Sequence, residues 1–444
     1  MLRAYGQKLR KAFGQFLPAA LINCARQGAP VKPLRTALKK VRKLLRSPNL
    51  FLRDFFLKRV PLSVGADINR KTTQDTKSTQ IRGLKRRAPM ETLFSGYISF
   101  SQPVDAVITW VDGNDPEFIM LREAHQEHDT SGKVAANNVA RYQSRDEIRF
   151  CVRSIRTYAP WIKTIYIVTN GQVPDWLDET QDRVKIITHD QIIPQKYLPT
   201  FNSHVIESCL HHIPGLSEHY VYFNDDVMLL QPAQPTDFFT ETGLLRGFVS
   251  SAVIPNGPIS VADTPSMTAI KNARAALFEK TGCYLSPMFA HTFHPQRKSV
   301  ALACEEVFAT ALHKCRQNKF RNTADILCTS FLFPCYAYVN GDGVFSKLRA
   351  WYFNVRDATA ESLYSELLAM KDDQSGPRSV CLNDHLPATL EYNFAGYETH
   401  LAKFLQHYFP LAHAAEKDRI SDTPSVRELP VEDITEEVLL VAVR

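Results

Sequence analysis

Apolar runs of strand length recur along the chain from about residue 104, and each run ends in polar residues. Four such runs cover residues 104–111, 164–169, 184–188 and 220–223. After the first run, Ser144 and Glu147 have the spacing of a capping box, and apolar residues then recur at helical spacing until Pro160. A second helix is expected from Ser203 to about His212. Strands that alternate with helices predict an α/β fold, with a mainly parallel, Rossmann-like sheet and flanking helices.

Polar side chains gather where the predicted strands end. Asn224, Asp225 and Asp226 directly follow the strand over residues 220–223. In open α/β sheets, ligands bind outside the carboxyl ends of the strands, and carboxylates at such a place can hold Mg²⁺. A simple turn would use the same residue types. The first strand adds three candidates of the same kind, for which a turn or core role is the alternative: Asp105, Trp110 and Asp112.

Charge divides the chain into two unequal regions. Residues 1–90 contain 22 Lys and Arg but only three acids, which gives them a net charge of +19, whereas the remaining residues carry a net charge of −12. The basic arm is suited to anionic lipid, an acidic polymer or nucleic acid, and a solvated, partly disordered arm is the equal alternative. Composition therefore suggests a basic arm and linker over residues 1–90, a catalytic domain over residues 91–413, and an acidic tail or helix over residues 414–444.

No apolar run approaches the roughly 20 residues that a membrane-spanning helix needs. The best candidate, residues 13–25, follows a basic start but is interrupted by Gln15, Pro18 and Asn23. The nine cysteines are scattered and form no CxxC pair. A location in a reducing compartment, without a membrane span, is the simplest interpretation.

Two stretches resemble the first two characteristic blocks of the Stealth family of sugar-phosphate transferases, which includes bacterial capsular polysaccharide phosphotransferases. The first is VDAVITWVDGNDP over residues 104–116. The second consists of separate segments, in the family's order and spacing, between residues 144 and 226: SRDEIR, RSI, YAPW, IYIVTNGQVP, LPTFNS, Glu207, IPGLSE and YFNDD. The resemblance implies a nucleotide-sugar-binding domain of the GT-A type.

Two later segments resemble the third and fourth blocks. The segment AHTFHP contains His291 and His294, and it precedes Arg321 in KFR, with Asp325 just beyond. Both histidines compete for the family's histidine position, and the distance to Arg321 favours His291. The fourth block is the short CLND, which ends in Asn383 and Asp384. The four blocks together cover roughly residues 104 to 385.

The resemblance implies transfer of a hexose or N-acetylhexosamine 1-phosphate from a UDP-sugar to a hydroxyl of a growing capsular polysaccharide, with release of UMP. It implies that His291 acts as the base, that Arg321 offsets phosphoryl charge, and that Mg²⁺ or Mn²⁺ binds at Asp225, Asp226 and Asp384. Such chemistry consists mainly of positioning and charge stabilisation. The remaining implied substrate-binding positions are Asp105, Trp110, Asp112, Gly113, Arg149, Arg153, Asn202, Ser203, Asn224 and Asn383.

The expected role of Arg149 and Arg153 has a structural alternative, and the expected phosphate site at Ser203 also has a basis in helix geometry. Arg149 and Arg153, four residues apart on one helix face, would equally suit ion pairs with Asp146 or Glu147. The helix that begins at Ser203 offers free N–H groups and a positive dipole end to a phosphate, and Asn202 adds a side-chain donor.

A cytoplasmic enzyme, held peripherally on the inner face of a bacterial membrane by its basic arm, fits these features. Its expected partners are the UDP-sugar and the capsular acceptor, together with anionic inner-membrane lipid or other capsule enzymes. A conventional glycosyltransferase that releases UDP is the first alternative, and a non-catalytic glycan-binding protein is the second. Nucleic-acid binding ranks last, because the region beyond the arm is acidic and contains no known reading motif.

Overall fold

The computed structural model describes residues 100–126, 142–180, 183–260, 263–372, 374–385, 396–411 and 416–417. The predicted basic arm and most of the acidic tail lie outside these residues. The division of the chain into arm, catalytic region and tail therefore stays a prediction. In the described part of the chain, no helix combines the length and apolar character that crossing a membrane requires.

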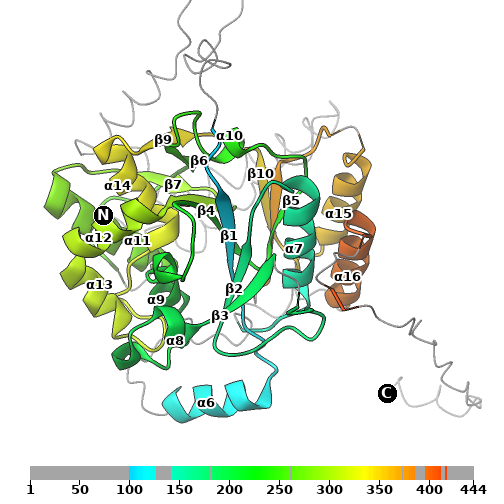
Figure 1. Cartoon of the computed structure of the whole chain (residues 1–444), viewed down its shortest axis with the longest axis horizontal. Coiled ribbons are helices and arrows are strands. Elements are labelled where there is room, and N and C mark those ends of the chain that lie inside the picture. Colours follow the sequence, from blue (N-terminus) through cyan, green and yellow to red (C-terminus); the bar gives the residue numbers. More distant parts are fainter. Residues whose placement is uncertain are drawn as a thin grey trace, which may run out of the picture.

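A five-stranded sheet runs through the middle of the molecule (Figure 1). Its strand order is β3-β2-β1-β4-β8, and the bounds are β1 (Val104–Thr109), β2 (Ile165–Thr169), β3 (Val184–Thr188), β4 (His219–Asn224) and β8 (His294–Arg297). The first four strands are parallel, and β8 alone runs antiparallel, beside β4. The predicted α/β fold with a mainly parallel sheet is confirmed.

Helices cover this sheet on both sides (Figure 1). On one side in that view lie α7 (Glu147–Tyr158), α15 (Ala360–Ala369) and α16 (Tyr397–Tyr408). On the other lie α9 (Ser203–Glu207), α11 (Pro265–Thr281), α12 (Lys298–Val307), α13 (Ala309–Arg316) and α14 (Phe333–Asn340). The remaining helical segments are α6 (Pro116–Gln126), α8 (His189–Ile192), α10 (Pro235–Phe238), two 3₁₀ turns at Gln195–Tyr197 and Leu210–His212, and a π-helical turn at Cys328–Leu332.

Two smaller sheets extend the core. One has the order β10-β11-β5, from β10 (Ala350–Asn354), β11 (Ser379–Asn383) and β5 (Val227–Leu229). The other has the order β7-β6-β9, from β7 (Pro287–Phe289), β6 (Leu245–Val253) and β9 (Gly343–Ser346). Because β5 follows β4 after a two-residue turn and pairs with β11, the Leu382 N–H reaches the Asp226 carbonyl at 2.9 Å. This pairing brings the segment around residue 383 to the end of β4.

Both predicted helices begin or end differently from the expectation. Helix α7 begins at Glu147 rather than after Ser144, because Asp146 takes a left-handed backbone conformation with φ of 68°. The Glu147 carboxylate accepts the Arg145 N–H at 2.6 Å, and the Ser144 hydroxyl accepts the indole N–H of Trp110 at 3.1 Å. The prediction of a capping box was therefore wrong, because Ser144 orients Trp110 instead of capping the helix.

The helix predicted from Ser203 to about His212 is also shorter than expected. Helix α9 ends at Glu207, and a separate 3₁₀ turn follows from Leu210 to His212. Its capping residue is Asn202, whose side-chain oxygen accepts the His204 N–H at 3.1 Å. One of the N–H groups that the sequence offered to a phosphate is thus already bonded within the protein.

Candidate active site

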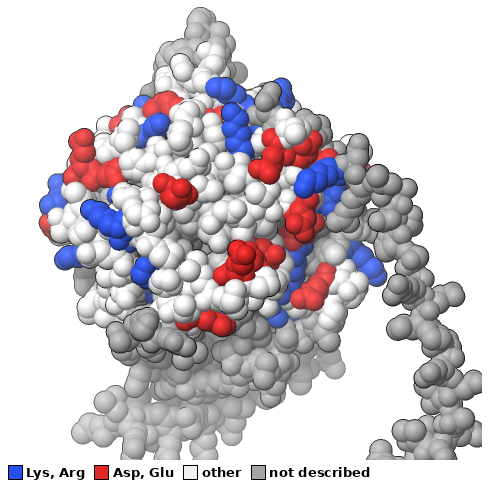
Figure 2. All heavy atoms as spheres, turned by 60° about the horizontal axis from the view of Figure 1, so that its bottom comes forward, with Lys and Arg blue, Asp and Glu red and all other residues white. Residues whose placement is uncertain are grey.

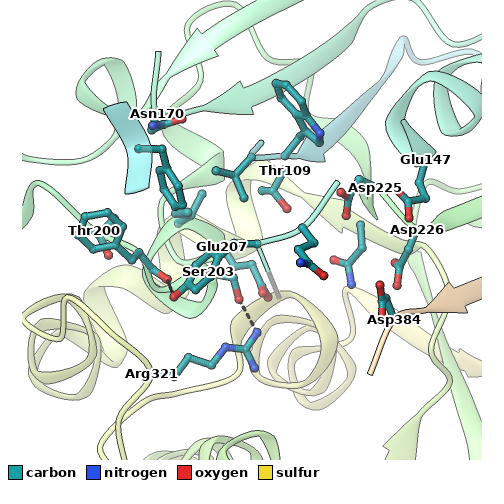
Figure 3. Close-up of a pocket in the computed structure, with 18 of the residues that line it drawn as sticks. Thr109, Glu147, Asn170, Thr200, Ser203, Glu207, Asp225, Asp226, Arg321 and Asp384 are labelled. Carbon is teal, nitrogen blue, oxygen red and sulfur yellow. Dashed lines mark hydrogen bonds between the residues drawn. The ribbon is translucent and has the colours of Figure 1, made fainter. Parts of the chain in front are cut away.

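A pocket of about 270 Å³ opens at the carboxyl ends of β1 and β4 (Figure 3). Its wall is built by the end of β1 and the residues that follow it, the turn after β4, the first turns of α7 and α9, and the end of β11. Segments that are far apart in the sequence, among them the loop that carries Arg321, therefore converge on one site. Eight of the residues that the sequence singled out line it: Trp110, Ser203, Asn224, Asp225, Asp226, Arg321, Asn383 and Asp384.

Four carboxylates form one wall of the pocket, which we call the acidic wall: Glu147, Asp225, Asp226 and Asp384 (Figure 3). Burial raises the pKa of Glu147 to about 7, and the negative charge of Asp226 contributes to this rise. Burial likewise raises the pKa of Asp225 and of Asp226, and the charges of Asp226 and Glu147 add to the rise at Asp225. These acids have lost hydration and repel one another, so a bound cation would relieve both costs.

Asp226 fits the part of a cation ligand. Its Oδ2 lies 3.4 Å from the Cys381 thiol, while its Oδ1 is buried and has no hydrogen-bond partner among the described residues. A buried, unpaired carboxylate oxygen is costly unless something binds it. Mg²⁺ and Mn²⁺ prefer oxygen ligands, and commonly take one or two carboxylates together with substrate phosphates. The donor set of the acidic wall therefore suits a divalent cation.

Asp384 is held differently from the other acids. Arg145 pairs with its Oδ2 at 2.5 Å, and the Arg356 guanidinium contacts both of its oxygens. The ring of Tyr397 lies 5.0 Å from the Arg145 guanidinium carbon and 4.5 Å from that of Arg356. The Asp384 carboxylate is thus fixed and its charge is compensated. Of the three acids expected to bind the cation, Asp384 would gain the least from one, because two arginines already compensate its charge.

Arg321 lies at the other end of the pocket, beside Ser203 and Glu207 (Figure 3). Its guanidinium donates to the Ser203 hydroxyl at 2.6 Å and to the Ser266 hydroxyl at 3.3 Å. Neither of these partners is charged. This end therefore offers a positive group with planar donor geometry, which suits a phosphate.

The loop that carries Arg321 is anchored by Asp325, which is fully buried. Its carboxylate accepts hydrogen bonds from the Asn202 and Asn318 side-chain amides at 3.0 and 2.9 Å, and from the Asn322 N–H at 2.9 Å. The structure thus places Asn202, expected to bind phosphate, in a buried network. Both ends of its amide are used, by Asp325 and by the cap of α9. This placement makes it a positioning residue for Arg321.

Three further residues expected to bind substrate lie away from the pocket lining. Asp105 is fully buried at the opposite end of β1, where its carboxylate accepts the Thr164 and Ser217 N–H groups at 3.1 and 2.8 Å. The other two are Arg149 and Arg153. Arg149 pairs with Asp146 at 3.6 Å, as its structural alternative anticipated, but both arginines also pair with Glu416, at 2.6 and 2.5 Å. Their charges hold the chain near residue 416 against α7.

The turn after β1 contributes through its backbone. The Gly113 N–H donates to the Tyr142 carbonyl at 2.7 Å, and a Cβ at position 113 would lie 2.2 Å from that oxygen. Only glycine fits this close approach. Asp112 accepts the Asn114 N–H at 2.9 Å, which closes the turn. Asp112 and Gly113 therefore shape the turn beside Tyr142, and Tyr142 and Trp110 line the pocket.

Neither candidate histidine lines the pocket. His291 is exposed and stacks on Tyr352, with ring centroids 4.4 Å apart. His294 is buried in β8 opposite Tyr222, and burial lowers its pKa to about 3. The imidazole of His294 is therefore neutral at physiological pH and a poor proton acceptor. His291 thus lies outside the pocket lining.

A different cluster has the spacing of metal ligands. In the described ranges, His211, His212 and Glu305 have potential ligand atoms that all lie within 4.8 Å of one another, and none of them lines the pocket. Glu305 Oε2 lies 2.9 Å from Nε2 of each histidine, and Glu305 also pairs with Arg316. A metal on Nε2 of His211 would leave a proton on its Nδ1, which is buried and meets no acceptor among the described residues. The cluster is better explained as an ion-pair network.

Glu147 lines the pocket, although the sequence analysis gave it only structural roles, in a capping box and as an ion-pair partner of Arg149 or Arg153. Its membership in the SRDEIR segment was visible, but the segment was interpreted as a helix start. The missing information was the left-handed Asp146, which turns the first residue of α7 into the pocket. Arg145 and Arg356, which hold Asp384, were missed as well. Arg356 lies outside the recognised segments.

Comparisons with known proteins match the two regions of the chain that resemble the first two blocks of the Stealth family. Conserved region 1 of Stealth proteins matches residues 102–124, and conserved region 2 matches residues 141–246. A capsular polysaccharide phosphotransferase of Haemophilus influenzae is 32% identical over 376 residues, which cover 84% of this chain and all of the relative. A capsular polysaccharide phosphotransferase of Neisseria meningitidis is 31% identical, with the same coverage.

Matches that cover less of this chain or of the matched protein add little. An exopolysaccharide phosphotransferase of Streptomyces coelicolor is 39% identical over 71% of this chain, but only 52% of the relative is covered. Among solved structures, the galactosyltransferase LgtC aligns with 69% of this chain and 96% of its own, at 10% identity and a TM-score of 0.35. That likeness is too slight to carry an argument. The two conserved regions and the full-length relatives show that this chain belongs to the Stealth family.

Proposed function

We propose that this chain transfers a hexose or N-acetylhexosamine 1-phosphate from a UDP-sugar to a hydroxyl of a growing capsular polysaccharide, with release of UMP. The relatives that align over their full length are named capsular polysaccharide phosphotransferases, which supports this class of reaction. The observation that carries the proposal is the arrangement of the pocket, with a wall of carboxylates at one end and Arg321 at the other. A cation and a guanidinium together would offset the negative charge of a sugar diphosphate.

The proposed step joins the acceptor oxygen to the phosphorus that bears the sugar. The bond from that phosphorus to the oxygen of UMP breaks, and UMP leaves with the bonding electron pair. The proton of the acceptor hydroxyl passes to a base of the enzyme. Arg321 donates hydrogen bonds to the phosphoryl oxygens, held in place by Ser203 and by the loop anchored on Asp325.

Glu147 is the base that the geometry favours over His291. It lines the pocket beside Asp225 and Asp226, and its pKa of about 7 suits a proton acceptor near neutral pH. His291 stacks on Tyr352 outside the lining. The two assignments differ in the pH profile that a Glu147→Gln variant should show.

Asp226 and Asp225 would hold the Mg²⁺ or Mn²⁺ ion, with the fixed Asp384 beside them. When bound, this ion would neutralise charge on the diphosphate of the UDP-sugar. The unpaired Oδ1 of Asp226 supports this assignment. The thiol of Cys381, on the Oδ2 side, orients the carboxylate.

The nucleotide product tests the proposal. The purified full chain is supplied with a panel of UDP-hexoses and UDP-N-acetylhexosamines, a short saccharide acceptor and Mg²⁺. We expect UMP by chromatography and a phosphodiester resonance by ³¹P NMR. A conventional glycosyltransferase would release UDP and form no phosphodiester, and that result would overturn the proposal.

The basic arm is proposed to hold the enzyme on the inner face of a bacterial membrane, against anionic lipid. On the face of the molecule in Figure 2, acidic and basic side chains are interspersed. The concentrated positive charge of the sequence lies instead in residues 1–90. Deleting residues 1–60 should therefore release the enzyme from vesicles that contain phosphatidylglycerol, and leave transfer to a soluble acceptor intact. Unchanged vesicle binding would refute this anchoring.

A further inference from the structure

His291 and Tyr352 form a stacked pair on the surface beside the pocket, which we call the Tyr352–His291 pair. The ring centroids are 4.4 Å apart and the ring planes meet at 27°. Tyr352 is 50% exposed, and His291 is exposed as well. Tyr352 lies in β10, which is the edge strand of its sheet, so the paired rings are presented at the surface beside β11.

The pair is held on a rigid support. Next to His291, Thr292 is buried and its hydroxyl lies 2.6 Å from the Ser379 hydroxyl at the start of β11. The following residue, Phe293, is 2% exposed and packs against the aromatic core. Tyr352 itself lies in β10, which pairs with β11 along its whole length. Two buried anchors and a strand pairing therefore fix both rings before any ligand arrives.

The pair adjoins the acidic wall. Tyr352 is directly opposite Cys381 in the parallel register of β10 and β11, so both side chains lie on the same face of that sheet. The Cys381 thiol lies 3.4 Å from Asp226 Oδ2. Burial, together with the neighbouring Cys381 and Asp226, raises the pKa of Tyr352 to about 12. The Tyr352 side chain is therefore close enough to feel the charge of Asp226.

We propose that the Tyr352–His291 pair is the acceptor subsite, on which the terminal saccharide ring of the acceptor stacks while its hydroxyl enters the pocket at the acidic wall. This inference rests on the proposed function, because it assigns the second substrate of that reaction. Aromatic faces receive the C–H surface of a saccharide ring, and an exposed imidazole can bond its hydroxyl groups. His291 then contacts the acceptor.

A saccharide suits this place better than the nucleotide does. The pocket already contains the partly buried indole of Trp110 at the end of β1, which offers a stacking face to a base. The Tyr352–His291 pair lies outside that lining and next to carboxylates, where an uncharged saccharide meets no repulsion but a nucleotide phosphate would. The two substrates thus have separate aromatic surfaces.

Saccharide binding without any UDP-sugar tests the subsite directly. Methyl glycosides of glucose, galactose, mannose and N-acetylglucosamine are titrated into the full chain and observed by saturation-transfer NMR. We expect at least one to bind the wild type, and Tyr352→Ala to weaken that binding about fivefold to tenfold. Tyr352→Phe keeps the stacking face and should stay within about twofold. In the transfer reaction, Tyr352→Ala should raise the acceptor KM by a similar factor and leave the KM for the UDP-sugar unchanged.

Phe278→Ala is the matched control, because Phe278 is 46% exposed on α11 and lies outside the pocket lining. It should leave glycoside binding unchanged. The subsite is refuted if no glycoside binds the wild type, or if Tyr352→Ala binds as tightly as the wild type while remaining folded by thermal melting. Because no donor is present, this result is independent of the proposed function. Release of UDP would overturn the function and leave the subsite standing.

Discussion

The two ends of the pocket differ in the charged groups that line them, and these groups are held in different ways. At the acidic wall, Glu147, Asp225 and Asp226 repel one another, and burial raises the pKa of each. At the other end, Arg321 is fixed by the neutral hydroxyls of Ser203 and Ser266. The acidic wall cannot receive a phosphate until a cation or protons neutralise it, whereas Arg321 offers a permanent positive charge at the end that also contains Glu207.

Because of this difference, we expect the activity to respond differently to substitutions at the two ends, and to depend on pH and divalent cation mainly through the acidic wall. Changes at the acidic wall should alter the dependence on divalent cation and on pH. Substitutions at the Arg321 end should lower kcat/KM by weakening the contacts with the phosphate, and they should leave the dependence on pH and on divalent cation unchanged.

Asp226→Asn should have the largest effect, a loss of about 10³ in kcat, because it removes the carboxylate with the unpaired oxygen. The amide keeps the shape of the side chain but binds a divalent cation weakly. Mn²⁺ binding to the full chain, followed by electron paramagnetic resonance, should weaken in parallel. A variant that turns over and binds Mn²⁺ like the wild type would show that Asp226 is not a cation ligand.

Glu147→Gln should reduce kcat by about 10² to 10³ and abolish the rise in rate with pH near 7 that the wild type should show. The measurement is kcat between pH 5.5 and 8.5. If His291 were the base, Glu147→Gln would retain the wild-type rise of kcat with pH, and His291→Gln would abolish that rise.

The same variant should change stability in a pH-dependent way. The folded protein keeps the Glu147 proton up to about pH 7, while the unfolded chain releases it near the ordinary value of 4.5. Stability of the wild type therefore falls as pH rises through this window, by about 1.4 kcal/mol per unit at most. Glu147→Gln does not titrate, so its unfolding free energy should exceed that of the wild type at pH 8 and match it more closely at pH 4.5. Urea denaturation at the two pH values measures the difference.

Arg321→Gln should lower kcat/KM about 10²-fold, since one guanidinium at the phosphate is lost. The Mg²⁺ concentration for half-maximal activity should stay as in the wild type, because the acidic wall is intact. Ser266→Ala is the control, as it removes the weaker of the two hydroxyl contacts, at 3.3 Å. A large shift in Mg²⁺ dependence for Arg321→Gln would contradict the separation of the two ends.

Cys381→Ala should have the smallest effect, about threefold to fivefold on kcat, because the thiol only orients Asp226. Cys381→Ser keeps a donor and should recover most of the loss. The Mg²⁺ dependence should shift for Cys381→Ala and return for Cys381→Ser. A purely structural role would lower thermal stability and leave the Mg²⁺ dependence unchanged.

The contrast between the two ends also shows what the sequence could predict. Strand-end residues such as Asn224, Asp225 and Asp226 were found because parallel strands deliver their carboxyl ends to one edge of a sheet. Arg321 and Asp384 came to the same pocket from distant segments, and only the family resemblance had grouped them. Periodicity alone predicted the four parallel strands, since each is a short apolar run with a polar end, but it did not predict β8, which has the sequence HPQR.

What the sequence could not show are the partners that decide whether a polar residue faces substrate or the protein. Asn202 is bound by Asp325, more than one hundred residues away, and Arg153 by Glu416, more than two hundred away. Glu147 enters the pocket because Asp146 takes a left-handed conformation, which aspartate can adopt but which nothing in the sequence marks at this position. Such long-range pairings and single backbone exceptions have no local signal.

The most direct test of the central claim follows one oxygen atom. A UDP-sugar is prepared with ¹⁸O in the bond between the sugar C1 and the β-phosphorus, and the products are separated and weighed by mass spectrometry. If both ends of the pocket act on the phosphorus that bears the sugar, all of the label stays in the saccharide phosphodiester and the released nucleotide is unlabelled UMP. Label in a released UDP would mean that the C1–oxygen bond breaks, and it would contradict the account.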